Sequence, residues 1–482
     1  MSDRQRPGNR KPDDGRSSRE TVARWRSGIA DGQSARHRAV RIIEATLASK
    51  APVDALLGAE QKELEHRDRA LLHELVLGTL RWLRRLDNVI QAASDRPLSR
   101  IDGALLGPLR VGTYQLLFLD RMPAYAAVDE AVRLARSRTH RGGANFVNAV
   151  LRRVSRDRAL DSWPVAESDA VRRLAIEWSH PDFLVERWHR RLGDAATRSL
   201  LEANNRPKPL HLLAFRDRGG REALGDRLRD EGCTVELSDI APLGLKVTKG
   251  SPLGGEAFRE GDFYVQDEAS QVSALLPMPS PGERILDVAA APGGKSFALL
   301  AVEPDLDLTL ADISLSRLCT VRRNLLRLKR KSRLLVTDGA RSAVDSRFDR
   351  VIVDLPCSGT GTLRRHPELK WRLSEAEISR LSREARRLVA GAARLVGSGG
   401  RLIVISCSLE DDENDAAVAP LLGGELAREP LPLEQVRLLP SAAPLAGLVE
   451  KSGVWRLWTA DDHDGFTVHV FARSRPGKPR KR

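Results

Sequence analysis

Two cysteines stand where a thiol could act as a nucleophile. Cys357 follows the apolar run RVIVD in Asp354-Leu-Pro-Cys-Ser, and Cys407 follows the run RLIVIS. A thiolate that adds to a substrate replaces one difficult step with easier ones, and at neutral pH it needs a depressed pKa or a nearby positive charge. Most free cysteines are small buried hydrophobic residues, and we assign that role to Cys233 and Cys319. The setting of the other two favours chemistry.

The elements that must position these thiols are strands of a parallel sheet. From Gly282 onward, short β-branched runs alternate with helical stretches, which predicts an α/β Rossmann-like domain with a doubly wound, mainly parallel sheet. The runs before Cys357 and Cys407 would be its fourth and fifth strands, which are neighbours in such a sheet. Both thiols should therefore emerge at the carboxyl edge, where open α/β sheets bind ligands.

The segment LDVAAAPGGKS (286–296) leads from the first strand, which ends at Asp287, into a helix. Gly293 and Gly294 lack a Cβ atom, so the backbone can turn sharply and approach a ligand. A phosphate-binding P-loop would need glycine where the chain has Ala289, and a dinucleotide fingerprint would need GxGxxG. An ordinary strand-to-helix turn is the remaining alternative.

Two further aspartates follow this loop at successive strand ends. Asp312 ends the second strand in LTLAD, and Asp338 ends the third in LVTDGA. A carboxylate at the tip of the second strand can accept hydrogen bonds from both ribose hydroxyls of a nucleoside, and Asp338 is placed to meet an adenine amino group. Each aspartate alone is more often a turn or cap residue. Their succession favours a nucleoside cofactor, and a positively charged sulfonium suits acidic surroundings better than a pyrophosphate.

Composition limits the classes of protein. A chain of 482 residues suggests about three domains, and a net charge of +14 favours a polyanionic partner, although a merely solvated surface is the alternative. We find no apolar run of the roughly 18 residues that cross a bilayer, and no secretion signal at the start. The four cysteines form no CxxC pair or His/Cys cluster, so neither a zinc site nor a disulfide framework is expected.

Five segments follow from these patterns. Residues 1–35 form a disordered basic arm, 36–158 an all-α domain, 159–281 a small α+β middle region, 282–473 the α/β domain, and 474–482 a basic tail. The arginines of the helical domain either face solvent or contact RNA. Arg364 and Arg365 are expected to meet phosphate.

The catalytic half resembles the RsmB/Sun family of RNA cytosine-5 methyltransferases, and RRHP followed by KW points to its bacterial ribosomal branch. The N-terminal helices resemble a NusB-type RNA-binding domain, in AYAAVDEAVRLAR and FVNAVLRRV. The motifs of the catalytic half, in the family's order, are VQDEAS (265–270), AAAPGGK (289–295), DLPCSGTG (354–361), RRHPELKW (364–371), SCSLEDDEN (406–414) and HDGF (463–466).

The resemblance implies a function and a set of residues. Cys407 would attack carbon 6 of cytosine, Cys357 would assist release, and Asp354 would hold the protonated edge of the base. The expected substrate is small-subunit ribosomal RNA, and the expected protein is a cytoplasmic monomer that binds no metal, DNA or membrane. The implied contacts of S-adenosyl-L-methionine are Ala289, Ala290, Ala291, Pro292, Gly293, Gly294, Lys295, Asp312, Asp338 and Asp354.

Two rival functions remain. A DNA cytosine-5 methyltransferase would carry its nucleophile on the fourth strand in Pro-Cys-Gln, whereas Ser358 follows Cys357 here. A non-catalytic RNA-binding or antitermination factor with an inert methyltransferase fold would not need the intact Cys407, Asp354 and glycine loop. The chain departs from the family pattern at Val288-Ala289, at Ser406, and at Leu212–Phe215, which stands where Leu-Arg-Val-Asn is usual.

Overall fold

The computed structural model divides the chain into two compact units. The first runs to Asp194 and takes in His366–Arg372, and the second contains Ala195–Arg365 and the chain from Leu373 onward. The basic arm and tail lie almost entirely outside the described residues. The structure describes residues 34–49, 51–120, 122–157, 160, 169–276, 278–342, 344, 347–422, 424–429, 454–459 and 463–474.

The first unit is helical, as its 3.6-residue periodicity predicts. Apolar side chains at helical spacing form one buried cluster mainly on α2, α3 and α4, which also takes in residues of α5 to α7, and another on α5 to α8. The helices are α2 (Ala35–Ala48), α3 (Val53–Glu60), α4 (His66–Arg81), α5 (Leu83–Ser94), α6 (Gly103–Phe118), α7 (Ala124–Arg136), α8 (Arg141–Arg156) and α9 (Ala170–Glu177).

The segment His366–Arg372, which contains the end of the RRHPELKW motif, belongs to this helical unit. Lys370 is buried, and its Nζ atom donates to the carbonyl oxygen of Arg81 at 2.8 Å. Trp371 Nε1 donates to the carbonyl oxygen of Leu80 at 2.6 Å. The last carbonyls of a helix have no partner within the helix, so these two side chains cap the end of α4.

The chain enters the second unit within a single helical element. The helix α10 (Asp182–Asn205) is broken at Gly193, whose φ of 76° is a left-handed conformation that glycine adopts without strain. A four-stranded antiparallel sheet follows, in the order β2-β3-β1-β4, with α11 (Gly220–Asp230) and α12 (Glu256–Glu260). Its strands are β1 (Leu210–Ala214), β2 (Thr234–Leu237), β3 (Gly244–Lys249) and β4 (Phe263–Val265).

The main sheet of this unit has the order β10-β12-β9-β8-β5-β6-β7, with β11 paired to β12. Strands β5 to β9 are parallel and β10 to β12 are antiparallel, which confirms a mainly parallel sheet. The strands are β5 (Arg284–Asp287), β6 (Asp307–Asp312), β7 (Arg333–Val336), β8 (Phe348–Asp354), β9 (Val396–Ser406), β10 (Leu426–Arg428), β11 (Val454–Leu457) and β12 (Phe466–Arg473).

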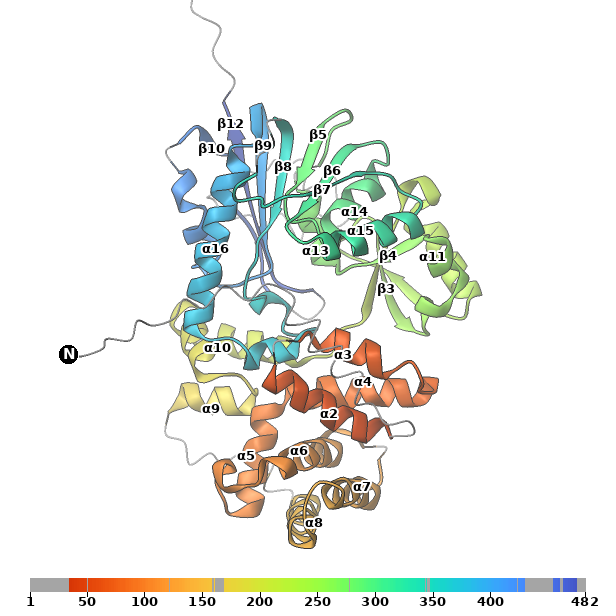
Figure 1. Cartoon of the computed structure of the whole chain (residues 1–482), viewed down its shortest axis with the longest axis vertical. Coiled ribbons are helices and arrows are strands. Elements are labelled where there is room, and N and C mark those ends of the chain that lie inside the picture. Colours follow the sequence, from red (N-terminus) through yellow and green to blue (C-terminus); the bar gives the residue numbers. More distant parts are fainter. Residues whose placement is uncertain are drawn as a thin grey trace, which may run out of the picture. The chain divides into compact units, whose positions relative to one another are not determined.

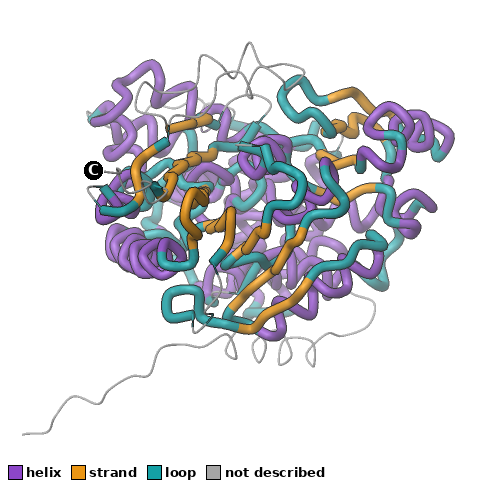
Figure 2. The backbone as a smooth tube through the Cα atoms, turned by 90° about the horizontal axis from the view of Figure 1, so that it is seen from above, coloured by secondary structure: helices purple, strands orange, loops and turns teal. Residues whose placement is uncertain are grey.

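Both faces of the main sheet are covered by helices, which makes it doubly wound. Along β8, Ile352 packs with α13, α14 and α15 on one face, whereas Val351 and Val353 pack with α16 on the other. Figure 1 shows α16 on one side of the sheet and α14 and α15 on the other, and Figure 2 shows the strands in orange. These helices are α13 (Glu268–Ala274), α14 (Gly294–Val302), α15 (Leu315–Arg327) and α16 (Glu375–Ala393).

The middle region shares a buried core with the α/β domain. Leu213 and Phe215, at the end of β1, are buried in the same cluster as Phe297 of α14. The departure from the family pattern at Leu212–Phe215 thus supplies apolar core residues. Among the described residues, no helix is long and apolar enough to cross a membrane.

Candidate active site

The two thiols predicted to share an edge of the sheet are neighbours. Strands β8 and β9 lie side by side (Figure 1) and pair in parallel, with Asp354 opposite Ile405. Each cysteine lies in the loop that follows its strand. The sulfur atoms of Cys357 and Cys407 are 3.4 Å apart, and both residues are partly exposed. A substrate atom bonded to one sulfur would therefore lie beside the other thiol.

A buried carboxylate holds the two cysteine loops together. Glu413, from the motif that contains Cys407, accepts hydrogen bonds from the backbone nitrogen of Ser358 at 2.9 and 3.1 Å and from its hydroxyl at 2.5 Å. Burial raises the pKa of Glu413. The hydroxyl of Ser408 lies 3.1 Å from that of Ser358 and joins the second loop to the same group. The residue that follows each thiol is thus fixed by buried polar contacts.

Gly361 marks the closest approach of the backbone near the thiols. Its nitrogen donates to the carbonyl oxygen of Cys407 at 2.9 Å, and its own carbonyl oxygen accepts from Gly465 at 2.8 Å. A Cβ atom on Gly361 would lie 2.7 Å from the Cys407 oxygen and would also collide with the Gly465 oxygen. Only glycine fits here without moving the loop that carries Cys407.

Lys295 brings a positive charge to the site. Its Nζ atom lies 3.2 Å from an oxygen of Asp354, 2.9 Å from the hydroxyl of Ser270 and 4.8 Å from the centre of the Phe466 ring. The side chain is 8% exposed, so these partners fix its position. The sequence placed Lys295 in the cofactor loop, but the structure puts its ammonium group beside the candidate catalytic carboxylate.

The pKa of the Cys407 thiol is raised, so of the two conditions named for a thiolate only the nearby positive charge is met among the described residues. The hydrogen bond with Cys357 and burial raise the pKa of Cys407 well above its usual value, and the charge of Asp354 adds to the effect. Lys295 acts in the opposite direction and lowers this pKa. The nearby positive charge that a thiolate needs is present, but the contact between the two thiols outweighs it.

A buried network of four charges supports this arrangement. Lys208 and Arg365 each pair with both Asp267 and Asp464; Lys208 lies 3.2 Å from Asp464, and Arg365 lies 2.5 Å from Asp267 and 2.9 Å from Asp464. Burial alone would raise the pKa of Asp267, but Arg365 and Lys208 hold it well below its usual value. Asp267 also caps α13, the helix that carries Ser270. The network thereby joins the VQDEAS, RRHP and HDGF motifs.

This network corrects the expectation that Arg364 and Arg365 contact phosphate. Arg364 is 2% exposed and donates to the carbonyl oxygen of Arg206 at 3.4 Å. Arg365 is directed at two buried carboxylates. Two adjacent arginines look the same in the sequence whether they bind a ligand or the protein's own acids, and here both bind the protein.

The loop after β5 has the backbone that the glycines predicted. Gly293 has a φ of 112°, and a Cβ atom there would collide with the ring of Phe297. At the strand end, burial raises the pKa of Asp287 to about 7, while a hydrogen bond of 2.7 Å from Ser296 opposes that shift. Ala289 to Lys295 thus form a tight connection between a buried strand and α14.

Asp312 and Asp338 differ in their surroundings. Asp312 is 1% exposed; its Oδ1 atom accepts from the nitrogen of Ser314 at 2.8 Å, and its buried Oδ2 atom has no hydrogen-bond partner within the described part of the chain. Asp338 is exposed two residues beyond β7, and it accepts from the nitrogen of Ala340 at 2.9 Å. Asp312 therefore offers a ligand an unsatisfied acceptor, which a ribose hydroxyl would satisfy.

Comparison with known proteins identifies the family. The profile of "16S rRNA methyltransferase RsmB/F" matches residues 274–443, that of the NusB family matches 33–156, and an RsmF/B-like ferredoxin-like domain matches 180–253. The "Probable ribosomal RNA small subunit methyltransferase B" of Bacillus subtilis is 33% identical over 364 residues, which cover 74% of this chain and 81% of that one. The chain belongs to the RsmB/F family of methyltransferases.

Other members and folds agree with this assignment. The "Ribosomal RNA small subunit methyltransferase B" of Pseudomonas putida is 32% identical over 437 residues, which cover 89% of this chain and 96% of that one. Among solved structures, the "Crystal Structure of PH0851" superposes with a TM-score of 0.73 at 26% identity and covers 90% of this chain and 98% of that one. The cofactor of this RsmB/F chain is S-adenosyl-L-methionine, and the unsatisfied buried oxygen of Asp312 fits its ribose.

Three residues of the site were not predicted. Ser270 and Phe466 contact Lys295, and Glu413 fixes the cysteine loops. All three lie in motifs that carry the family resemblance. The motifs were therefore the sequence signal for these residues, but the groups that the residues contact lie far away in the chain.

Proposed function

We propose that the chain methylates carbon 5 of a cytosine in small-subunit ribosomal RNA through a covalent bond between Cys407 and carbon 6. The observation that carries the proposal is the 3.4 Å distance between the two sulfur atoms beside the Lys295–Asp354 pair. The printed names of the relatives from Bacillus subtilis and Pseudomonas putida supply the class of RNA. The domain limits inferred from the sequence remain part of this proposal.

Covalent addition would solve the main chemical difficulty, because carbon 5 of cytosine is a poor nucleophile. The Cys407 sulfur bonds to carbon 6, the thiol proton ends on N3, and the electrons of the ring double bond become available at carbon 5. Asp354 accepts a hydrogen bond from the protonated N3 edge and holds the ring. S-adenosyl-L-methionine supplies the methyl group that carbon 5 then takes.

Release restores the ring and the enzyme. A base removes the proton of carbon 5, the electron pair re-forms the ring double bond, and the bond between carbon 6 and Cys407 breaks. The Cys407 thiolate recovers the proton held on N3. Cys357, whose sulfur lies beside that of Cys407, assists this step.

The methyl donor would be held at the carboxyl ends of β5, β6 and β7. Asp312 would bind the ribose, Asp338 the adenine amino group, and the Ala289–Lys295 loop would pass close to the sulfonium end beside Asp354. RNA is favoured over DNA because Ser358 follows Cys357, where the DNA enzymes carry glutamine. The protein would act as a cytoplasmic monomer.

Bisulfite sequencing of ribosomal RNA tests the reaction and its target. A strain that lacks the gene should lose protection of a small-subunit cytosine that is protected in the parent strain. A plasmid copy of the natural gene should restore the protection, and a Cys407→Ala copy should not. If no cytosine loses protection, the proposed reaction is wrong.

A further inference from the structure

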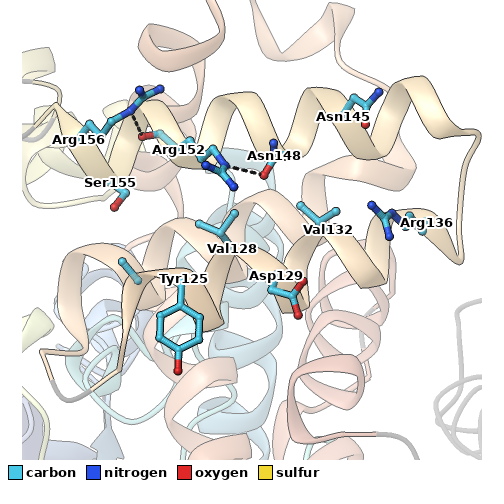
Figure 3. Close-up of a pocket in the computed structure, with 11 residues that line it drawn as sticks. Tyr125, Val128, Asp129, Val132, Arg136, Asn145, Asn148, Arg152, Ser155 and Arg156 are labelled. Atoms are coloured by element: carbon cyan, nitrogen blue, oxygen red, sulfur yellow. Dashed lines mark hydrogen bonds between the residues drawn. The ribbon is translucent and has the colours of Figure 1, made fainter.

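A groove runs between α7 and α8 of the helical unit. Figure 3 shows polar and charged side chains from both helices along it, with Val128 and Val132 between them. The groove encloses about 680 Å³, which lies within the range of roughly 300–1,000 Å³ typical of ligand sites. The side chains that decide its chemistry are Tyr125, Arg136, Asn145, Asn148, Arg152 and Arg156.

The three arginines of this α7/α8 groove differ from other arginines of the same unit. Arg110 pairs with Asp87 at 2.7 Å, and Arg153 pairs with Asp95 at 2.6 Å. By contrast, Arg136, Arg152 and Arg156 are exposed, and none of them pairs with a carboxylate among the residues that the structure describes. Arg152 donates instead to the amide oxygen of Asn148 at 3.0 Å, and Arg156 to the carbonyl oxygen of Arg152 at 3.1 Å.

The acid that lines the groove, Asp129, is bound at 2.7 Å by Arg133, a residue of α7 outside the groove lining. Arg133 also lies 3.5 Å from Glu130. The three groove arginines and Arg133 outnumber these two carboxylates, so the groove keeps an excess of positive charge. Such a cluster attracts a polyanion, because each phosphate bound releases condensed counterions.

The remaining lining suits bases rather than a phosphate backbone alone. Tyr125 is 78% exposed, although aromatic side chains usually bury most of their surface. An exposed ring offers a platform on which an unpaired base can stack, and asparagine side chains can hydrogen-bond base edges. The buried side chains of Val128 and Val132 give the groove an apolar floor.

We propose that the α7/α8 groove binds single-stranded RNA, with a base stacked on Tyr125 and phosphates on Arg136, Arg152 and Arg156. This inference rests on the proposed function, because it takes the ribosomal RNA substrate as the source of the strand. A protein partner is less well matched, since the groove has no continuous apolar surface and carries uncompensated positive charge. The groove would hold a flanking segment of the RNA while the target cytosine enters the sheet edge.

The aromatic contact is tested with a matched pair of variants of the full chain. Tyr125→Ala should weaken binding of an unstructured oligouridine by roughly five- to 150-fold, the range measured when one stacking side chain is removed. Tyr125→Phe keeps the ring and should bind within about twofold of the natural chain. The residue is exposed, so both variants should fold, and equal melting temperatures would verify this.

The charged contacts are tested through salt. Arg152→Gln with Arg156→Gln should make the dependence of log affinity on log salt less steep by about 1.4, at roughly 0.7 per phosphate on a single strand. Lys62→Gln with Arg67→Gln removes two exposed charges of the same unit outside the groove and should change the slope by less than half as much.

The outcomes separate this inference from the proposed function. If the full chain methylates ribosomal RNA and the groove variants bind oligouridine like their controls, the groove assignment is wrong and the reaction stands. If Tyr125→Phe loses as much affinity as Tyr125→Ala, stacking is wrong. If the natural chain neither binds nor methylates RNA, the proposed function itself fails.

Discussion

At the carboxyl edge of the sheet, the side chains assigned to chemistry are held by buried partners, whereas the α7/α8 groove leaves its charged groups in solvent. Glu413 is fully buried and fixes the turn after Cys357, and Lys295 is held by three neighbours. In the groove, Tyr125 is 78% exposed, and Arg152 and Arg156 make local hydrogen bonds along α8. The two regions therefore differ in how firmly their functional atoms are placed.

The difference follows from what each region has to do. A bond-forming step needs its reacting atoms within a few tenths of an ångström of one geometry, which buried networks can provide. Holding a flexible strand requires positive charge and ring surface, and it tolerates side-chain motion. Small changes at the sheet edge should therefore alter rates, whereas changes in the groove should alter affinity.

The largest expected effect is at the two thiols. Cys407→Ala should abolish methyl transfer and any covalent protein–RNA adduct, because it removes the attacking sulfur. Cys357→Ala should still attack and methylate but release slowly, so a covalent complex should accumulate as a shifted band on a denaturing gel. The groove variant Tyr125→Ala should form no such band beyond the natural level.

The same gel can reverse the assignment. An adduct that persists in Cys407→Ala and disappears in Cys357→Ala would make the fourth-strand cysteine the nucleophile. If neither variant forms an adduct and both lose stability together, the cysteines are structural. Thermal unfolding of the two variants distinguishes these results.

The next largest effect is expected on the rate of methyl transfer when Gly361 is substituted. A Cβ atom there would meet the carbonyl oxygens of Cys407 and Gly465, so Gly361→Ala should displace the Cys407 loop. A misplacement of about 1 Å can lower a rate by roughly a hundredfold. Single-turnover methyl transfer measures the loss. Gly254→Ala is the control, since a Cβ atom there meets nothing within 4 Å, and an equal loss in both variants would refute this account.

The order of helices and strands could be predicted from the sequence because it depends on local periodicity. The sequence also placed Cys357, Cys407 and Asp312 correctly, because the ends of neighbouring parallel strands meet at one edge. It could not show that Lys370 caps α4 or that Arg365 pairs with buried acids, since those partners lie far away in the chain. The groove residues Tyr125, Arg136 and Arg152 lie in the two stretches that resemble a NusB-type domain, but the sequence could not show that these stretches line one groove.

Substitution of Asp312 should have a moderate effect on the affinity for S-adenosyl-L-methionine. Asp312→Ala removes the buried acceptor assigned to the ribose hydroxyls, and a hydrogen bond to a charged group contributes roughly 1.5–3 kcal/mol. Calorimetric titration with S-adenosyl-L-methionine should show a correspondingly weaker Kd in a folded variant. Asp338→Ala, at an exposed turn, should lose less. Unchanged affinity in Asp312→Ala would refute the ribose contact.

The smallest expected effect is a shift in the pH dependence of adduct formation. Because the pKa of Cys407 is raised, the thiolate fraction and the single-turnover rate of adduct formation should increase as the pH rises above neutrality. Cys357→Ala removes the largest cause of that raised pKa. In this variant, the rate of adduct formation should therefore begin to increase at a lower pH than in the natural chain. Lys295→Met removes a charge that lowers the pKa of Cys407, so the increase in its rate of adduct formation should begin at a higher pH than in the natural chain.

The groove supplies the control for this titration. Tyr125 lies in the other unit and is not among the groups that shift the pKa of Cys407. Tyr125→Ala should therefore keep the pH midpoint of adduct formation of the natural chain, even where it weakens RNA binding. Adduct formation would be followed on denaturing gels across a pH series at saturating RNA. A single midpoint shared by all four proteins would mean that ionisation of Cys407 does not limit the reaction. Opposite shifts in Cys357→Ala and Lys295→Met would instead show that the two side chains beside the thiol control its charge.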